Sequence, residues 1–189
     1  MPRQPSRERM IAAAETLMRE QGLAGAAINP VVKLSRAPIG SVYHHFPGGK
    51  TQLASEALRI HGEKVRRLLV AAFDTKKPLP QRLRTSFRHA ATVFEDAGAR
   101  KGCAIGAVTL DLGRHDEALR EVCEEIFASW VDAIAPLLPW RSSRKRRSFA
   151  VAIVTAIEGA FILGRAQRSG DPFIAAGEWL AAASKSRRS

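Results

Sequence analysis

The chain has 189 residues, of which 46% are hydrophobic and 25% charged, a mix typical of a soluble globular protein rather than a disordered one. Lys and Arg number 30 against 18 Asp and Glu, and the resulting net charge of +12 favours a polyanionic partner. We expect no membrane span, no signal peptide and no disulfide framework from Cys103 and Cys123, and therefore a cytoplasmic location.

Apolar residues recur every three or four positions along nearly the whole chain, the period of amphipathic helices. Asn-Gly and Asp-Gly pairs, which mark hairpins, do not occur in the sequence. The first helix is predicted to begin at Pro5-Ser6 and to stop at Gly22. The second is predicted to start near Asn29-Pro30, with Asn29 as its cap, and the third near Pro38.

Longer helices are predicted after the third one. The segment 103–112 is apolar on nearly all sides, so we expect it to be buried if it is helical. The other helices are expected over 50–73 and 80–96, from Asp116 to about Ile134, over 142–168, and from Pro172 onward. The sequence therefore predicts an all-α fold of about nine helices.

Residues 23–50 read as two short helices joined by a tight connection and packed on the first helix. This arrangement is a helix-turn-helix, in which the second short helix enters the major groove of DNA. Its small core is expected to consist of Val31, Val32, Leu34, Ala37 and Val42, closed by Phe46.

The segment SVYHHFPGGKTQLASEAL resembles the recognition helix and following helix of TetR-type bacterial transcriptional repressors. The matching positions are Gly40, Ser41, Val42, Tyr43, His45, Phe46, Lys50 and Leu53. The F-P-G-G-K motif, with GCAIGAV at 102–108, further resembles a drug- and flavonoid-responsive branch of these repressors. The resemblance implies a helix-turn-helix DNA-binding domain at 1–50 and a helical ligand-binding and dimerisation domain at 51–189.

Five residues depart from the family pattern. Ala26-Ala27 replaces the usual Thr or Ser, Pro30 replaces Asp, and Ile39 stands where a polar or basic residue is common. Arg36 occupies a turn position that is usually glycine. Either Arg36 adopts an unfavourable positive φ or the turn differs from the family's.

The resemblance implies that the third helix contacts an operator. Base edges are assigned to Ile39, Ser41 and His44, because the Ile39 side chain can contact a thymine methyl and the other two can hydrogen-bond. Phosphate contacts are assigned to Tyr43, His45 and Lys50, with Lys33 and Arg36 as second-rank candidates.

The resemblance also places an inducer site among the middle helices. An aromatic or amphipathic small molecule fits best, because ligand pockets are mostly apolar with a few polar groups. The polar candidates are His61, Thr109 and Asp111, and the apolar candidates are Leu69, Phe73, Phe87, Phe94, Cys103, Val108, Phe127 and Trp130.

A homodimer interface is expected on the last two helices. Small residues on the helix at 142–168 allow a partner helix to approach closely while large ones interdigitate. The candidates are Phe149, Ile153, Ala156, Ile157, Ala160, Phe161, Gly164, Phe173, Ile174 and Trp179. The same strip could instead pack within its own subunit.

The leading interpretation is a ligand-responsive regulator, a probable repressor, that binds a pseudo-palindromic operator as a dimer. An alternative is a helical small-molecule-binding protein or enzyme with a vestigial DNA-binding domain, and another is a helical protein-interaction module. No catalytic motif is found, so we expect no enzyme activity, no cofactor and no metal site.

Overall fold

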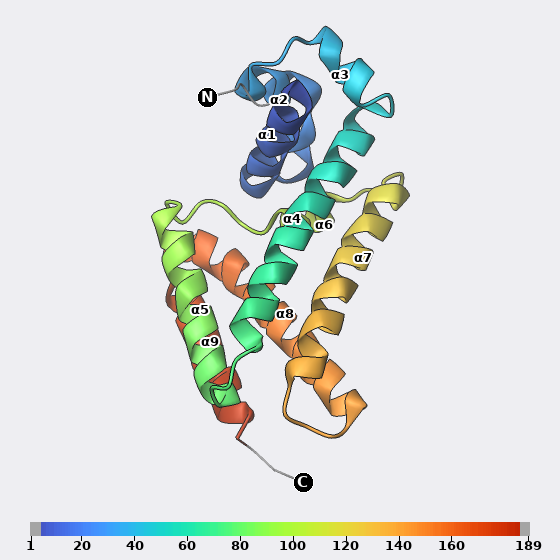
Figure 1. The fold of residues 1–189 in the computed structure, drawn as a ribbon. Helices are drawn as coiled ribbons and strands as arrows, with labels where there is room; N and C mark the ends of the chain where they lie inside the picture. Colours follow the sequence, from blue (N-terminus) through green and yellow to red (C-terminus); the bar gives the residue numbers. More distant parts are fainter. Residues whose placement is uncertain (1–4, 186–189) are drawn as a thin grey trace. The chain divides into compact units, whose positions relative to one another are not determined.

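The structure is a computed structural model that describes residues 5–185 (Figure 1). Over these residues the fold contains nine α-helices and two short 3-10 helices and no strand, which confirms the all-α expectation. The elements are α1 (Ser6–Gln21), η1 (Gly22–Ala26), α2 (Ile28–Ser35), α3 (Gly40–His45), α4 (Gly49–Phe73), α5 (Leu79–Asp96), α6 (Ala104–Asp111), α7 (Glu117–Ile134), η2 (Ala135–Leu137), α8 (Ser143–Gln167) and α9 (Asp171–Ala183).

The chain forms two compact units, which differ from a division at residue 50. The first unit comprises residues 1–63 and 103–126, and the second comprises 64–102 and 127–189. Helix α4 continues without a break past residue 50, so the helix-turn-helix shares its unit with the first part of α4.

In the first unit, α1 supplies the central face of the core. Met10, Ala14 and Met18 lie four residues apart, on one side of the helix, and are fully buried. Helix α1 packs against α2 and α6. Val31, Val42 and Phe46 are buried as expected, whereas Leu34 is 51% exposed and does not belong to this core.

Helix starts and stops follow the local backbone chemistry. Helix α1 ends at Gly22, whose φ of +62° suits glycine. The expected Asn29 cap is wrong, because the cap of α2 is Ala27, two residues earlier, and the helix begins at Ile28. Pro30 is tolerated as the third helical residue because the first N–H groups of a helix have no partner within it.

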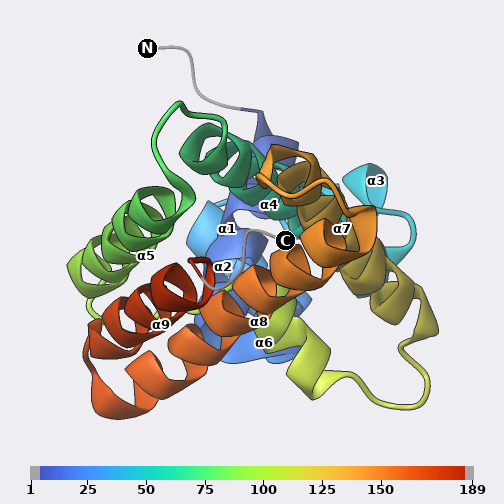
Figure 2. The same ribbon diagram turned by 90° about the horizontal axis from the view of Figure 1, so that it is seen from below.

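In the second unit, α5 and α8 both pack on α9 (Figure 2). Glycines permit this close approach: a Cβ on Gly177 would lie 2.6 Å from the Cβ of Phe87. The aromatic rings of Phe94, Phe161 and Phe173 lie with their centroids 5.0–5.9 Å apart and fill the space between the three helices.

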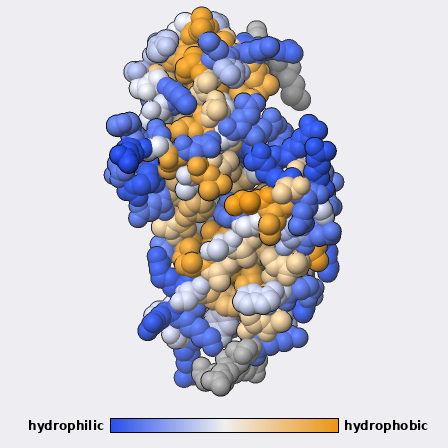
Figure 3. Space-filling model, turned by 180° about the vertical axis from the view of Figure 1, so that it is seen from behind, coloured by the Kyte–Doolittle hydropathy of each residue, from blue (hydrophilic) through white to orange (hydrophobic). Residues whose placement is uncertain are grey.

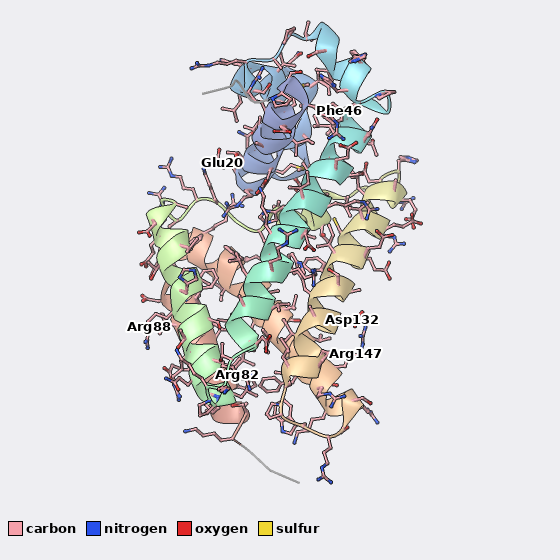
Figure 4. All side chains as sticks on the ribbon, viewed as in Figure 1. Glu20, Phe46, Arg82, Arg88, Asp132 and Arg147 are labelled. Carbon is pink, nitrogen blue, oxygen red and sulfur yellow. The ribbon has the colours of Figure 1, made fainter. Side chains whose placement is uncertain are left out.

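Arg82 links the C-terminal end of α4 to η2 within the second unit (Figure 4). Its guanidinium donates to the carbonyl oxygen of Phe73 at 2.5 Å and to that of Leu137 at 3.0 Å. Burial lowers the pKa of Arg82, and the charge of Asp74 opposes this shift. Arg82 thus satisfies carbonyl groups at two helix ends that lack intrahelical partners.

Helix α8 is the one helix of the described residues that is long and apolar enough to cross a membrane. This criterion uses length and composition only. A helix whose apolar face is covered by a second protein chain satisfies it equally well, so α8 by itself gives no reason to assign a membrane span.

Candidate nucleic-acid interface

The turn between α2 and α3 is built around Arg36. This residue ends α2 in the left-handed conformation, with φ +52° and ψ +35°, so the first of the two alternatives left by the sequence is correct. After the turn, Ala37 is buried, and Pro38 starts the next turn of helix by accepting from the Ser41 N–H at 3.0 Å. The Ser41 hydroxyl also donates to the Pro38 carbonyl, at 2.6 Å.

Helix α3 has one buried and one exposed face. Val42 and Phe46 point into the unit and are 1% and 0% exposed. Ile39 and Tyr43, which are also four residues apart and so lie on one side, are 58% and 64% exposed. Two large exposed side chains that lie together on one face make this face a candidate contact surface.

The remaining candidates for DNA contact surround this exposed face. His44 is exposed, and Ser41 and His45 are half-buried. The Nε2 atom of His45 lies 2.8 Å from the Ser6 hydroxyl, which ties the ring to the start of α1. The side chains of Lys33, Arg36 and Lys50 are exposed.

Two arginines of α1 hold the helix-turn-helix in place, and sequence reasoning did not single them out for this. Arg7 pairs with Glu56 of α4 and lies 5.6 Å from the centroid of the Phe46 ring. Arg9 donates from Nε to the carbonyl oxygen of Ser35 at 3.0 Å. Their partners lie 26 or more residues away in sequence, so the local pattern contained no signal for these contacts.

The polar residues expected to orient a ligand have structural partners in the first unit. His61 is buried, and its Nδ1 lies 3.1 Å from the Glu15 carboxylate. The Asp111 carboxylate accepts a hydrogen bond from the Leu23 N–H at 2.8 Å. These two residues therefore join α4 and α6 to the α1–η1 segment, and their role in orienting a ligand stays a prediction.

Thr109 also has internal partners. Its hydroxyl donates to the Ile105 carbonyl at 2.8 Å and is hydrogen-bonded to the side chain of Cys123. Burial raises the pKa of the Cys123 thiol, and the Thr109 hydrogen bond opposes that shift. Cys103 and Val108 are buried in the same unit. Among residues 5–185, no three His, Cys, Asp or Glu side chains gather where they could hold a metal ion.

The aromatic candidates in the second unit separate into two groups. Phe87 and Phe94 pack against Gly177 and Gly164 in the core between α5 and the last two helices, and a ligand contact at either residue stays a prediction. Leu69, Phe73, Phe127 and Trp130 remain candidates. Phe127 is half-buried, and its ring contacts the Trp130 ring edge to face, with centroids 5.3 Å apart.

The expected dimer face is only partly on the surface. Ile153, Ala160, Gly164 and Phe173 are buried inside the second unit, so they cannot present a surface to another chain, and they are removed from the set. The exposed side of the last two helices includes Trp179, 69% exposed, and three residues that were not expected. These are Val151, Ile162 and Leu163, which are 45–55% exposed.

Five members of the expected set are partly exposed in the single chain: Phe149, Ala156, Ile157, Phe161 and Ile174. The view from behind shows hydrophobic atoms along the middle of this face, with hydrophilic atoms along both sides (Figure 3). An exposed apolar face with a polar rim is typical of a protein–protein interface.

Comparison with known proteins gives a consistent set of relatives. A family described as "Transcriptional regulator LmrA/YxaF-like, C-terminal domain" matches residues 80–179. The HTH-type transcriptional regulator LmrA of Bacillus subtilis is 30% identical over 171 residues, which cover 89% of this chain and 91% of LmrA. An uncharacterized HTH-type transcriptional regulator of Mycobacterium tuberculosis is 33% identical over 186 residues, which cover 89% of each chain.

Solved structures with the same fold include regulatory proteins. The regulatory protein TetR from Rhodobacter sphaeroides has a TM-score of 0.82 at 22% identity, covering 94% of this chain and 97% of that one. A cysteine mutant of the regulator CifR, complexed with 26-bp operator DNA, has a TM-score of 0.81 at 17% identity, covering 97% and 99%. At these identities, the likeness establishes the fold.

Proposed function

We propose, from the premise that this chain belongs to the TetR family of transcriptional regulators, that it binds operator DNA as a homodimer and that a small molecule releases it. The observation that carries the DNA-binding part is the exposed face of α3. Ile39 and Tyr43 lie in water while Val42 and Phe46 of the same short segment are buried. In a helix-turn-helix, that is the face that enters the major groove.

Each side chain has a role that follows from its surroundings. The Ser41 hydroxyl proton is engaged by the Pro38 carbonyl, so Ser41 would accept a hydrogen bond from an adenine or cytosine amino group. Ile39 would contact a thymine methyl, and the exposed His44 would hydrogen-bond a base edge. The phosphate contacts are assigned to Tyr43, His45 and Lys50, and in second rank to Lys33 and Arg36.

A two-fold dimer would place two copies of α3 on successive half-sites. Their centres should lie about 34 Å apart, one turn of DNA, or a multiple of that spacing. Support for the dimer comes from the exposed apolar side of α8 and α9, where Trp179, Ile162 and Val151 stand in water in the single chain. The complex of CifR with operator DNA shows that this fold can accommodate DNA in one regulator, without giving the operator of this one.

The inducer is proposed to be aromatic or amphipathic. The remaining candidate residues of the second unit are apolar: Leu69, Phe73, Phe127 and Trp130. A ligand would release DNA only to the extent that it prefers the DNA-incompetent state, and such couplings are typically ~1–3 kcal/mol. Response to a drug or flavonoid rests on the sequence motif alone.

The experiment is a fluorescence-anisotropy titration of the full chain with the DNA upstream of its own coding region. The protein should prefer this DNA over a scrambled duplex, and Tyr43→Ala should weaken operator binding while sedimentation still shows the dimer. Equal affinity for both duplexes would exclude operator recognition. For the ligand, a flavonoid that binds tightly without changing operator affinity would contradict the proposed release.

A further inference from the structure

The excess of positive charge in this chain lies in the second unit. The first unit, which contains α1 to α3, holds 10 Lys and Arg residues and 11 Asp and Glu residues. The second unit holds the other 20 Lys and Arg residues and 7 acidic ones, an excess of 13 positive charges. Operator recognition by α3 therefore does not account for the net charge of +12.

The densest group of these charges is the 141–147 cluster, which consists of Arg141, Arg144, Lys145, Arg146 and Arg147. It covers the loop before α8 and the first turn of that helix. Neither the core of the second unit nor the exposed apolar side of α8 requires five cations at this place. No acidic residue interrupts the run.

Only part of the cluster is engaged within the chain. Arg147 pairs with Asp132 of α7, Arg146 donates to the Trp140 carbonyl at 3.0 Å, and the Lys145 ammonium lies 5.0 Å from the centroid of the Trp140 ring (Figure 4). Arg141 and Arg144 are exposed and form no ion pair with any residue of the part of the chain that the structure describes.

This arrangement is electrostatically unfavourable in the isolated chain. Arg144 and Arg147 are three residues apart on α8, a spacing at which like charges repel. The cluster also stands at the N-terminal end of α8, where the helix dipole disfavours cations. A bound polyanion would remove both penalties, and such violations of local rules are expected at functional sites.

The chemistry of the cluster indicates phosphate groups of a nucleic acid. Four of the five cations are arginines, which bind phosphate oxygens through two parallel hydrogen bonds. A membrane-binding basic helix usually adds exposed apolar side chains that enter the lipid. Of the large apolar residues just before the cluster, Leu138 is buried and Trp140 is half-buried, with its ring 4.8 Å from that of Phe149.

We propose that the 141–147 cluster is a second DNA-binding surface, which holds the phosphate backbone of double-stranded DNA without reading its sequence. It acts independently of α3. Contact with phosphates releases condensed counterions, so binding through this surface should weaken steeply as salt increases.

The test uses a background variant, Tyr43→Ala/Lys50→Ala, and a random-sequence 26-bp duplex that contains no operator, measured by anisotropy between 50 and 200 mM salt. This background should still bind the duplex. Adding Arg141→Glu/Arg144→Glu should reduce its affinity at 50 mM salt at least tenfold and lower the salt-dependence slope by about 2, at ~0.9 per phosphate contact.

The matched control is Arg88→Glu/Arg100→Glu in the same unit. Both residues are exposed, and the change in charge is the same, so this control isolates position from net charge. Its affinity should stay within about threefold of the background. Equal losses in the two charge variants, or no loss in either, would overturn the proposal. If the glutamate variant misfolds, Arg141→Gln/Arg144→Gln decides by the same criteria.

Two further measurements test membrane binding by the cluster and its independence of α3. Binding of the background variant to phosphatidylglycerol vesicles that exceeds binding to duplex at equal phosphate concentration would overturn it in favour of a membrane. The preference of the otherwise wild-type chain for its own upstream DNA at 200 mM salt should survive Arg141→Glu/Arg144→Glu. Loss of that preference would contradict the independence of the two surfaces.

Discussion

The junction of α1, η1 and α6 makes a sharp energetic prediction. Gly22 has φ +62°, and a Cβ built on it would lie 1.9 Å from Oδ2 of Asp111. The same oxygen accepts the Leu23 N–H at 2.8 Å. An alanine at position 22 would therefore meet both an unfavourable backbone conformation and the carboxylate, which would have to move and give up its hydrogen bond.

The magnitudes follow from these two contributions. A backbone at φ +62° and ψ −146° is nearly exclusive to glycine and costs another residue roughly 1–3 kcal/mol, of which we take about 1.5 kcal/mol. A hydrogen bond to a charged group contributes about 1.5–3 kcal/mol, and we take the lower end, about 1.5 kcal/mol, because Asp111 is exposed. We expect Gly22→Ala to cost roughly 3 kcal/mol and Asp111→Ala about 1.5 kcal/mol. The double variant should cost roughly 3 kcal/mol rather than the additive 4.5 kcal/mol, because Gly22→Ala already displaces the carboxylate.

The assay is urea denaturation of the four proteins at one fixed protein concentration, because the stability of a dimer depends on concentration. Gly49→Ala is the matched control: its φ is +60° and no atom lies within 4 Å of the added Cβ, so it reports the backbone cost alone. Additive losses in the double variant, or a Gly22→Ala loss no larger than that of Gly49→Ala, would refute the reasoning.

Three other substitutions test separate parts of the structure. Arg36→Gly should raise the free energy of unfolding by about 0.5–1 kcal/mol, because φ +52° no longer carries a side chain, whereas Arg36→Ala should not; equal effects in urea melts would contradict this. Arg82→Met should cost about 2 kcal/mol by leaving the carbonyls of Phe73 and Leu137 without their donor, and an unchanged urea midpoint would contradict that role. Trp179→Glu should dissociate the dimer in sedimentation with the helical circular-dichroism spectrum retained, and an intact dimer would exclude Trp179 from the interface.

Helix positions could be predicted because their ends carry strong local signals. Gly22 stops α1 and Pro5-Ser6 starts it, as expected from backbone chemistry alone. The replacement of glycine by Arg36 correctly pointed to a positive φ as one of two alternatives. The start of α2 was misplaced by two residues, because Asn29 is a good cap by type but Ala27 occupies the cap position.

What the sequence could not decide is which side of an apolar helix faces inward. Helix α8 carries apolar residues around much of its circumference, so its period does not distinguish the buried Ile153 and Ala160 from the exposed Val151 and Ile162. Hydrogen bonds between residues far apart in the sequence could not be predicted from local patterns either. The Asp111–Leu23 hydrogen bond joins residues 88 positions apart.

The central claim is that the exposed face of α3 lies against the base pairs of an operator. The direct measurement is photo-crosslinking of the full chain with p-benzoylphenylalanine in place of Ile39, on DNA from upstream of its coding region. Leu110, 72% exposed on α6, is the matched control position. We expect a crosslink from position 39. An excess of unlabelled operator should abolish it, and an excess of scrambled DNA should not. Position 110 should give no crosslink. Bound DNA without a crosslink from position 39 would contradict the central claim.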